Sequence, residues 1–292
     1  MLPEDSEWEK VLWRKQEYPD NYIPQRLFLT SLRKNVNFSP YTYWPLVLLS
    51  CAITQHLATI FLFLAVFVRL KERLLDARIL LYISMAIFLA GYMLWELLDY
   101  HYPEHGVSRI GRSKTFKYSL LLFLTLMGLS PVLKTLTAAT SSDSIWALSA
   151  CLFTVNALLA DYSSSKPAPS RGRLTSVISM NAAISSSVVL ASRLSDDLDV
   201  FVLILFSVQL FALFPILRHR LQVTPSILQA VLTFVLSASC IILTAPLSTT
   251  ATWIYTAALI IVTFLAPGVL VWAQKYKNEI RGPWDVAVPR MS

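Results

Sequence analysis

The residues best placed to do chemistry in this sequence are charged side chains within or beside apolar stretches. Lys134 lies in Leu129–Thr137 (LSPVLKTLT), a nonapeptide that ends an apolar run with Pro131. A lysine at the centre of a bilayer-spanning helix costs about 2.5 to 3.5 kcal/mol. Such a lysine therefore has a partner, lies at a helix break or lies near the membrane surface. The segment marks either a reaction centre or a packed helix break.

Motifs of soluble enzymes are absent from the sequence. It holds only seven glycines, with no glycine-rich phosphate loop, no HExxH and no GxSxG. His101 and His105 are four residues apart, but Pro103 lies between them and no third metal ligand is evident. Glu96 and Asp99 are interpreted as helix-end charges rather than an acid–base pair. The sequence therefore predicts no catalytic residue, no metal site and no cofactor.

Basic residues gather in the loops on one predicted side of the membrane. Two interpretations stay open, either solvated loop charges or a site for an anionic inositol lipid headgroup. The linker 163–173 is rich in Ser and Pro and carries three of these charges. The headgroup candidates are Asp161, Arg171, Arg173, Arg218 and Arg220.

A second set of polar residues lies within or beside the apolar segments and is expected to form buried pairs. Its members are Lys134, Asp143, Asn181 and Arg193. Asn181 lies opposite a stripe of small residues, repeated every four positions from 179 to 191, that lets another helix approach closely. Arg193 is followed by three aspartates at 196–199 that can neutralise it. Lys134 is expected to pair with Asp143 or with a lipid phosphate.

The elements that must position these residues are membrane-spanning helices. The chain has 292 residues and a mean hydropathy of +0.55, and only 15% of its residues are charged. Its long apolar stretches approach the roughly 20 residues that a spanning helix needs. We predict an all-α polytopic bundle of about eight helices, the third and fourth short or broken. The expected spans are 44–68, 79–98, 116–133, 145–160, 174–194, 200–217, 227–245 and 252–273.

The bundle, residues 44–273, is flanked by two polar tails, 1–43 and 274–292. The first tail carries a capping box, Ser6 to Glu9, and an amphipathic helix behind it. This helix either lies on the membrane surface or docks a partner. A Gly-Pro turn in the second tail presents Trp284. We expect Trp8, Trp13 and Trp284 to form docking contacts.

The distribution of Lys and Arg predicts the orientation. Of the 25 basic residues, nineteen fall in the tails and in the loops that share their side. This bias places both termini in the cytosol. The segment 69–78, with four basic residues, is the exception. The net charge of +7 is attributed to orientation and anionic lipid rather than to nucleic acid.

The chain resembles the PIG-C family of phosphatidylinositol N-acetylglucosaminyltransferase subunits from one tail to the other. The matching stretches run in the same order along both. They are WEKVLWRKQ from Trp8, YPDNY from Tyr18, SPVLKTLT from Ser130, DSIW from Asp143, Asp161-Tyr162, Met180-Asn181, LASRL from Leu190, QLFALFP from Gln209 and GPWD from Gly282. The loops 101–115 and 163–173 depart from the family pattern.

This resemblance implies an endoplasmic-reticulum protein of the first step of GPI-anchor synthesis. The complex transfers N-acetylglucosamine from UDP-GlcNAc to phosphatidylinositol on the cytosolic face, and another subunit supplies the catalytic domain. The chain would then be a non-catalytic membrane subunit that acts as a scaffold and offers the lipid substrate a binding groove. The alternative, drawn from prolines 131, 215 and 267 as helix breaks, is a stand-alone lipid transporter or scramblase.

Overall fold

The computed structural model describes part of the tails and most of the apolar segments. The described residues are 15, 19, 22–24, 28–30, 32–34, 39–101, 121, 124–125, 127–129, 131–132, 141–162, 170–221, 226–277 and 280–281. They belong to two compact units. One is residues 44–267, and the other is formed by the two tails, residues 1–43 with 268–292.

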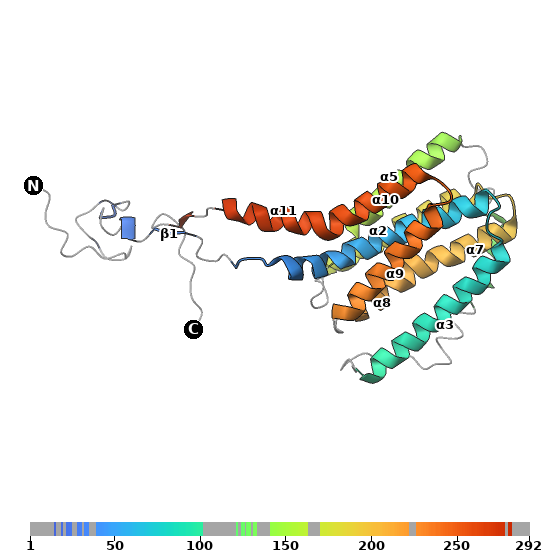
Figure 1. Cartoon of the computed structure of the whole chain (residues 1–292), viewed down its shortest axis with the longest axis horizontal. Helices are drawn as coiled ribbons and strands as arrows, with labels where there is room; N and C mark the ends of the chain where they lie inside the picture. Colours follow the sequence, from blue (N-terminus) through green and yellow to red (C-terminus); the bar gives the residue numbers. More distant parts are fainter. Residues whose placement is uncertain are drawn as a thin grey trace, which may run out of the picture. The chain divides into compact units, whose positions relative to one another are not determined.

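The larger unit is a bundle of long α-helices (Figure 1). The α-helices of the described chain are α2 (Tyr43–Lys71), α3 (Ala77–His101), α5 (Ser142–Leu159), α6 (Ser170–Ala191), α7 (Asp197–Val208), α8 (Phe214–Leu221), α9 (Ser226–Thr244), α10 (Thr249–Ile260) and α11 (Ala266–Ala273). The π-helical segment η1 (Gln209–Leu213) joins α7 to α8, and η2 (Ile261–Leu265) joins α10 to α11. The fold is therefore an all-α membrane helix bundle, as the sequence predicts.

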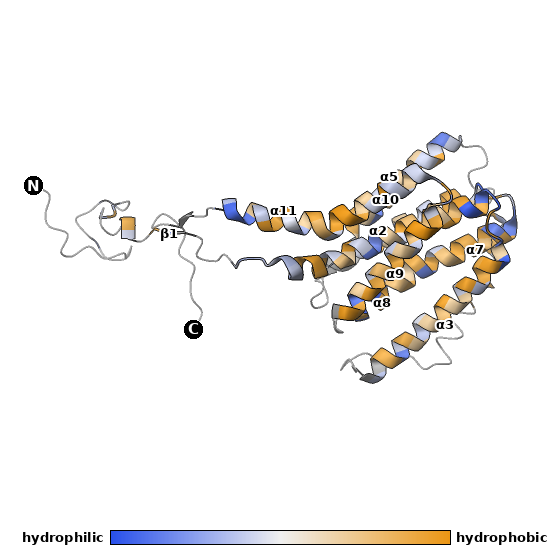
Figure 2. Cartoon of the chain, in the orientation of Figure 1, coloured by the Kyte–Doolittle hydropathy of each residue, from blue (hydrophilic) through white to orange (hydrophobic). Residues whose placement is uncertain are grey.

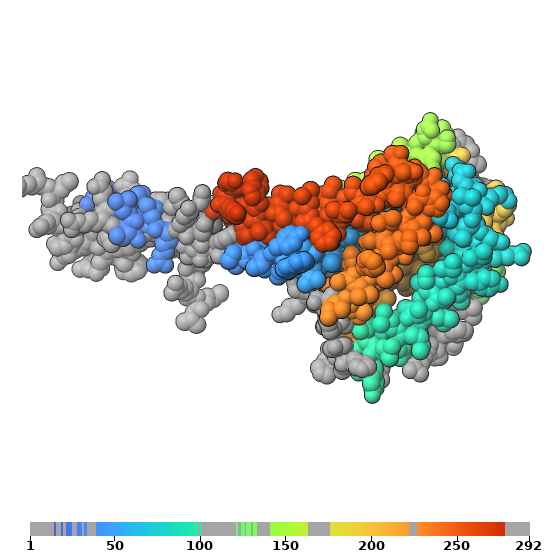
Figure 3. All heavy atoms as spheres, in the orientation of Figure 1, coloured from blue at the N-terminus to red at the C-terminus, as the bar shows by residue number. Residues whose placement is uncertain are grey.

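Two of the helices form the interior of the bundle. About two thirds of the most apolar windows of α2 and of the continuous helix 197–221 are buried, against about a fifth in α3, α5, α9 and α10. Phe63 of α2, Phe153 of α5 and Phe211 of η1 pack together with ring centroids 5.6–5.7 Å apart. These rings anchor the hydrophobic core. The outer helices instead expose large apolar side chains, among them several of α3. This helix lies at the surface in Figure 3.

Each π-helical segment ends two residues before a proline. Pro215 follows η1 and Pro267 follows η2. A proline has no N–H to give to the carbonyl four residues back, and a π turn is one way in which a helix absorbs that loss. The carbonyl that Pro267 leaves free belongs to Thr263. It lies 3.2 Å from Ser50 Oγ, whose one proton it shares with the Val47 carbonyl at 2.7 Å. The predicted breaks at these prolines are thus local changes within continuous helices.

Six described helices are long and apolar enough to cross a membrane: 43–71, 77–98, 142–159, 197–221, 227–244 and 249–276. They agree with the first, second, fourth, sixth, seventh and eighth predicted spans. The fifth corresponds to α6, whose apolar part, Ser176–Ala191, is shorter. The predicted third span lies largely outside the described residues. Hydrophilic residues gather at the helix ends (Figure 2).

The smaller unit joins the two tails through a pair of short strands. β1 (Arg33–Lys34) pairs antiparallel with β2 (Ile280–Arg281), with Arg33 opposite Arg281. The backbone N–H of Tyr41 also donates to Gln274 Oε1 at 2.9 Å, and Gln274 Nε2 returns a bond to the Tyr41 carbonyl at 3.0 Å. The two tails therefore lie next to each other.

Candidate functional site

Three consecutive polar residues of α2 connect it to three other segments of the bundle. Thr54 Oγ1 lies 2.8 Å from Thr263 Oγ1 of η2, Gln55 Nε2 donates to Thr233 Oγ1 of α9 at 2.9 Å, and His56 Nε2 lies 2.9 Å from Asn156 Oδ1 of α5. Successive residues of an α-helix point about 100° apart, so one turn can reach three neighbours. All these side chains are buried. We call these contacts the α2 polar layer.

The His56 branch of this layer continues into α6. Asn156 Nδ2 donates to the carbonyl and the hydroxyl oxygen of Ser179, at 2.9 and 3.0 Å, and Ser179 Oγ donates to the Asn156 carbonyl at 2.8 Å. Because these bonds make Nδ2 the donor atom, Oδ1 of Asn156 is an acceptor, and His56 Nε2 must carry the proton that it receives. The chain of bonds fixes the tautomer of a buried histidine and binds α2, α5 and α6 together.

Arg218 lies next to this layer and is 3% exposed. Its guanidinium donates to the carbonyls of Ala52 (3.2 Å) and Asp161 (2.8 Å) and lies 5.8 Å from the ring centroid of Tyr162. The Asp161 carbonyl follows the C-terminus of α5, where the helix dipole favours a cation. Three neutral groups with negative potential thus surround this charge, which the Asp161 carboxylate also attracts.

Tyr162 supports the same corner of the bundle. Its hydroxyl donates to the Ala157 carbonyl at 2.6 Å, and its ring meets that of His56 edge-on at 5.7 Å. Burial raises the pKa of Tyr162 to about 12, against the opposing effect of Arg218. The phenol therefore stays protonated at neutral pH and keeps its donor role.

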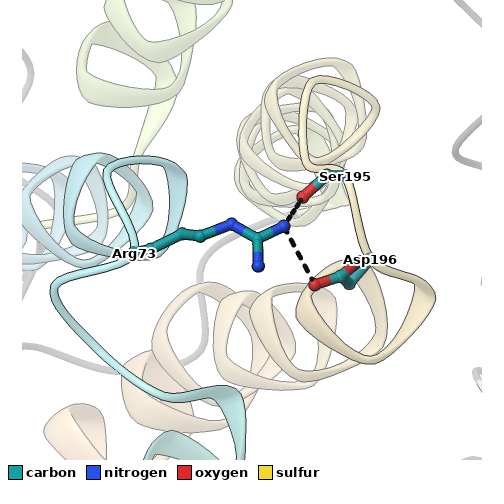
Figure 4. A network of polar contacts seen from close by, with 3 residues as sticks. All are labelled: Arg73, Ser195 and Asp196. Carbon is teal, nitrogen blue, oxygen red and sulfur yellow. Dashed lines mark hydrogen bonds and ion pairs between the residues drawn. The ribbon is translucent and has the colours of Figure 1, made fainter.

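Charged loops are paired at the other end of the bundle. Arg73 Nη2 donates to Ser195 Oγ at 2.8 Å and lies 3.4 Å from Asp196 Oδ2 (Figure 4). Arg69 donates to the Leu243 carbonyl at 3.0 Å, near the C-terminus of α9. The end of α2 and the residues after it are therefore bonded to the α6–α7 connection and to the end of α9.

The structure brings some of the predicted headgroup candidates together. Arg218 meets Asp161 through the backbone carbonyl of Asp161, while the Arg220 guanidinium lies 5.9 Å from the ring centroid of Trp95. Arg218 and Asp161 thus share a corner, and Arg220 faces α3. The side chains of Arg171 and Arg173, at the start of α6, lie outside what the structure describes.

The described members of the predicted pairing set lie on α5, on α6 and just after α6. Asp143 is exposed in the first turn of α5, behind the N-cap Ser141. Asn181 is exposed on α6, and Arg193 is half-buried just after the end of that helix. Asp196, one of the three aspartates that the sequence offers to Arg193, pairs with Arg73. Lys134, Trp8, Trp13 and Trp284 lie outside the described residues.

Sequence reasoning did not assign roles to His56, Asn156, Gln55 or Arg73. The signal for the α2 residues is a run of polar side chains, Thr54-Gln55-His56, inside an otherwise apolar span. Among the described residues, no group of three or more His, Cys, Asp or Glu side chains is placed to hold a metal ion.

Several long apolar helices joined through a buried polar layer define a multi-pass α-helical membrane protein. Residues 8–285 match the GPI2 family, described as phosphatidylinositol N-acetylglucosaminyltransferase, and the chain belongs to that family.

Curated relatives match over nearly the whole chain. A Schizosaccharomyces pombe protein named the phosphatidylinositol N-acetylglucosaminyltransferase GPI2 subunit is 38% identical over 97% of this chain and 87% of its own length. The Homo sapiens and Rattus norvegicus proteins, each named as a subunit of the same transferase, are both 36% identical over 96% of this chain and 92% of their own length. No solved structure matches the chain.

Proposed function

We propose that this protein is a non-catalytic membrane subunit of the complex that transfers N-acetylglucosamine from UDP-GlcNAc to phosphatidylinositol, the first step of GPI-anchor synthesis. Near-full-length similarity to proteins named as subunits of that transferase supports the assignment. The α2 polar layer supports a scaffold role, because its side chains use their hydrogen bonds to hold the helices of the chain together. Its site is the endoplasmic-reticulum membrane, with both termini in the cytosol.

The experiment that tests this function is purification in mild detergent. The chain should be recovered with a catalytic glycosyltransferase subunit and other membrane subunits, and transfer to phosphatidylinositol should be lost when the chain is absent. Recovery of a complex that transfers the sugar normally without this chain would contradict the proposal.

The second part of the proposal is that the corner near Arg218 and Arg220 helps to present phosphatidylinositol. One basic residue near a membrane surface contributes about 1 kcal/mol to anionic lipid binding, roughly a fivefold change in affinity. Arg220→Gln should therefore raise the KM for phosphatidylinositol about fivefold and leave the KM for the sugar donor unchanged. Arg73→Gln, the same substitution at the other end of the bundle, is the control. An unchanged lipid KM in the Arg220 variant would argue against presentation.

Asn181 supports a contact with another subunit. It lies within the apolar part of α6 and is exposed, with no hydrogen bond to any described residue. A side-chain amide facing hydrocarbon without a partner is costly, whereas interhelical bonds of such groups contribute about 0.6 kcal/mol on average. We therefore assign to Asn181 a bond to a helix of a partner subunit. Asn181→Leu should lower the recovery of partners about threefold at equal chain abundance.

The alternative of a stand-alone transporter or scramblase would use broken helices to line a passage. In this bundle, the carbonyl freed by Pro267 accepts a shared hydrogen bond from Ser50, so that break is closed by α2. This contact favours the scaffold. Lipid movement by the chain alone in liposomes would instead favour the alternative.

A further inference from the structure

A small cavity lies between α2, α8 and α9, next to the α2 polar layer. Its lining consists of Ala52, Gln55, Arg218, Leu221, Gln229 and Leu232. The space open to the centre of a water-sized sphere is about 10 Å³. A cavity holds one water molecule when this space reaches roughly 10 to 15 Å³. The cavity is therefore at the lower limit for a single water and far too small for a lipid headgroup.

Two polar atoms among its lining residues lack hydrogen-bond partners among the described residues. They are Gln55 Oε1 and Arg218 Nε. Their side chains are only 2% and 3% exposed, so bulk solvent does not satisfy them. The remaining polar atoms of both side chains are bonded, Gln55 Nε2 to Thr233 and the two terminal nitrogens of Arg218 to backbone carbonyls. A buried polar atom without a partner costs about 1 to 3 kcal/mol, which a trapped ligand would remove.

The chemistry of the two atoms selects the ligand. Gln55 Oε1 only accepts hydrogen bonds, and Arg218 Nε–H only donates them. A bridging ligand must therefore donate to the first and accept from the second. Chloride and other simple anions cannot donate and would be repelled by the amide oxygen, and metal cations would be repelled by the guanidinium. Water does both and matches the available space.

We propose that this cavity holds one internal water molecule that bridges Gln55 Oε1 and Arg218 Nε. The water completes the hydrogen bonding of the α2 polar layer and joins it to Arg218. It also connects α8 to α2 without a carboxylate. The site lies beside the proposed lipid contact and shares Arg218 with it.

A pair of substitutions of nearly equal shape tests the water. Ala52 lines the cavity and is 8% exposed, so a larger side chain at this position competes for the space. Ala52→Thr places a hydroxyl there that can donate and accept as the water does, whereas Ala52→Val places only methyl groups. In the full chain, the valine variant should unfold about 3 to 6 °C below the threonine variant, because it displaces the water and leaves both polar atoms unpaired.

The two variants also distinguish a cavity that holds a water molecule from a dry cavity. If the cavity is dry, filling it with methyl groups adds packing contacts, and the valine variant should unfold at the same temperature as the threonine variant or above it. That result would overturn the proposal. A high-resolution density map of the assembled complex should show one isolated peak within hydrogen-bonding distance of both atoms, and an empty cavity would equally overturn it. Neither readout depends on transferase activity, so failure here leaves the proposed function untouched.

Discussion

Asn156 shows at the scale of a residue how this bundle uses polar side chains at membrane depth. Its amide accepts a bond from His56 and gives two to Ser179. Both polar atoms of the amide are bonded, and the partners come from two other helices. Asn156 therefore links three helices within the chain, just as the chain is proposed to link subunits within the complex.

Replacing Asn156 by Leu should destabilise the folded chain. The substitution leaves the His56 N–H buried without an acceptor and removes the two bonds that Asn156 Nδ2 donates to Ser179, at an expected cost of about 1 to 2 kcal/mol. Equilibrium unfolding of the purified chain in detergent measures the change.

The matched control for this substitution is Asn181→Leu. Asn181 is the same residue type on a neighbouring helix, but it is exposed and has no bond to any described residue. The free energy of unfolding of the isolated chain should therefore change by less than about 0.5 kcal/mol in this variant. An equal decrease in the free energy of unfolding of the two variants would show that the hydrogen bonds of Asn156 do not stabilise the folded chain.

The Arg73 connection shows at the scale of an element how the ends of the helices are fixed. The Leu74 N–H donates to the Arg69 carbonyl at 2.8 Å and the Arg73 N–H to the Leu70 carbonyl at 3.1 Å, which is a Schellman motif at the end of α2. Arg73 has a φ of 56° at the position where glycine is usual. Its ion pair with Asp196 is exposed at both ends and contributes less than about 1 kcal/mol.

Two substitutions at Arg73 separate backbone strain from charge pairing. Arg73→Gly and Arg73→Ala both lose the contacts with Ser195 and Asp196, but only alanine keeps a side chain at positive φ. The glycine variant should therefore be more stable than the alanine variant by about 1 kcal/mol. Unfolding in detergent at matched salt measures the difference. A more stable alanine variant would show that the turn carries no strain.

The elements themselves were largely predictable, because each long apolar run demands a helix in lipid. Six of the eight predicted spans agree with described helices to within a few residues. The contacts between elements were not predictable. Thr54, Gln55 and His56 are visibly polar, but their partners depend on which helices are neighbours in the bundle. Arg73 likewise lies more than a hundred residues from Asp196, and nothing local distinguishes that aspartate from its neighbours.

At the scale of the whole molecule, the paired tails constrain the topology. β1 and β2 join the two tails in one unit, and we therefore predict that the chain crosses the membrane an even number of times. Six long apolar helices and the shorter α6 make seven described candidates. An even number therefore requires either that one more segment crosses, for which the predicted third span is the candidate, or that one of the seven does not cross.

The basic segment 69–78, which covers the end of α2 and the start of α3, runs against the overall charge bias, and the fold explains why. Arg69 donates to the Leu243 carbonyl, Lys71 lies 5.6 Å from the ring centroid of Trp146, and Arg73 pairs with Asp196. Three of its four basic side chains are thus held by groups of the fold. Charges held in this way are a weaker signal for orientation than the basic residues of the tails.

We therefore predict that the tails face the cytosol and the α2–α3 connection faces the lumen. Leu74 is 61% exposed in that connection, and Lys275 is exposed beyond α11. Single cysteines at these two positions, in a chain whose three native cysteines are replaced, can be labelled in sealed endoplasmic-reticulum vesicles with an impermeant maleimide. Lys275→Cys should react at once and Leu74→Cys only after the membrane is opened. The reverse order of labelling would show that the tails face the lumen, on the opposite side of the membrane from the cytosolic partners proposed for them.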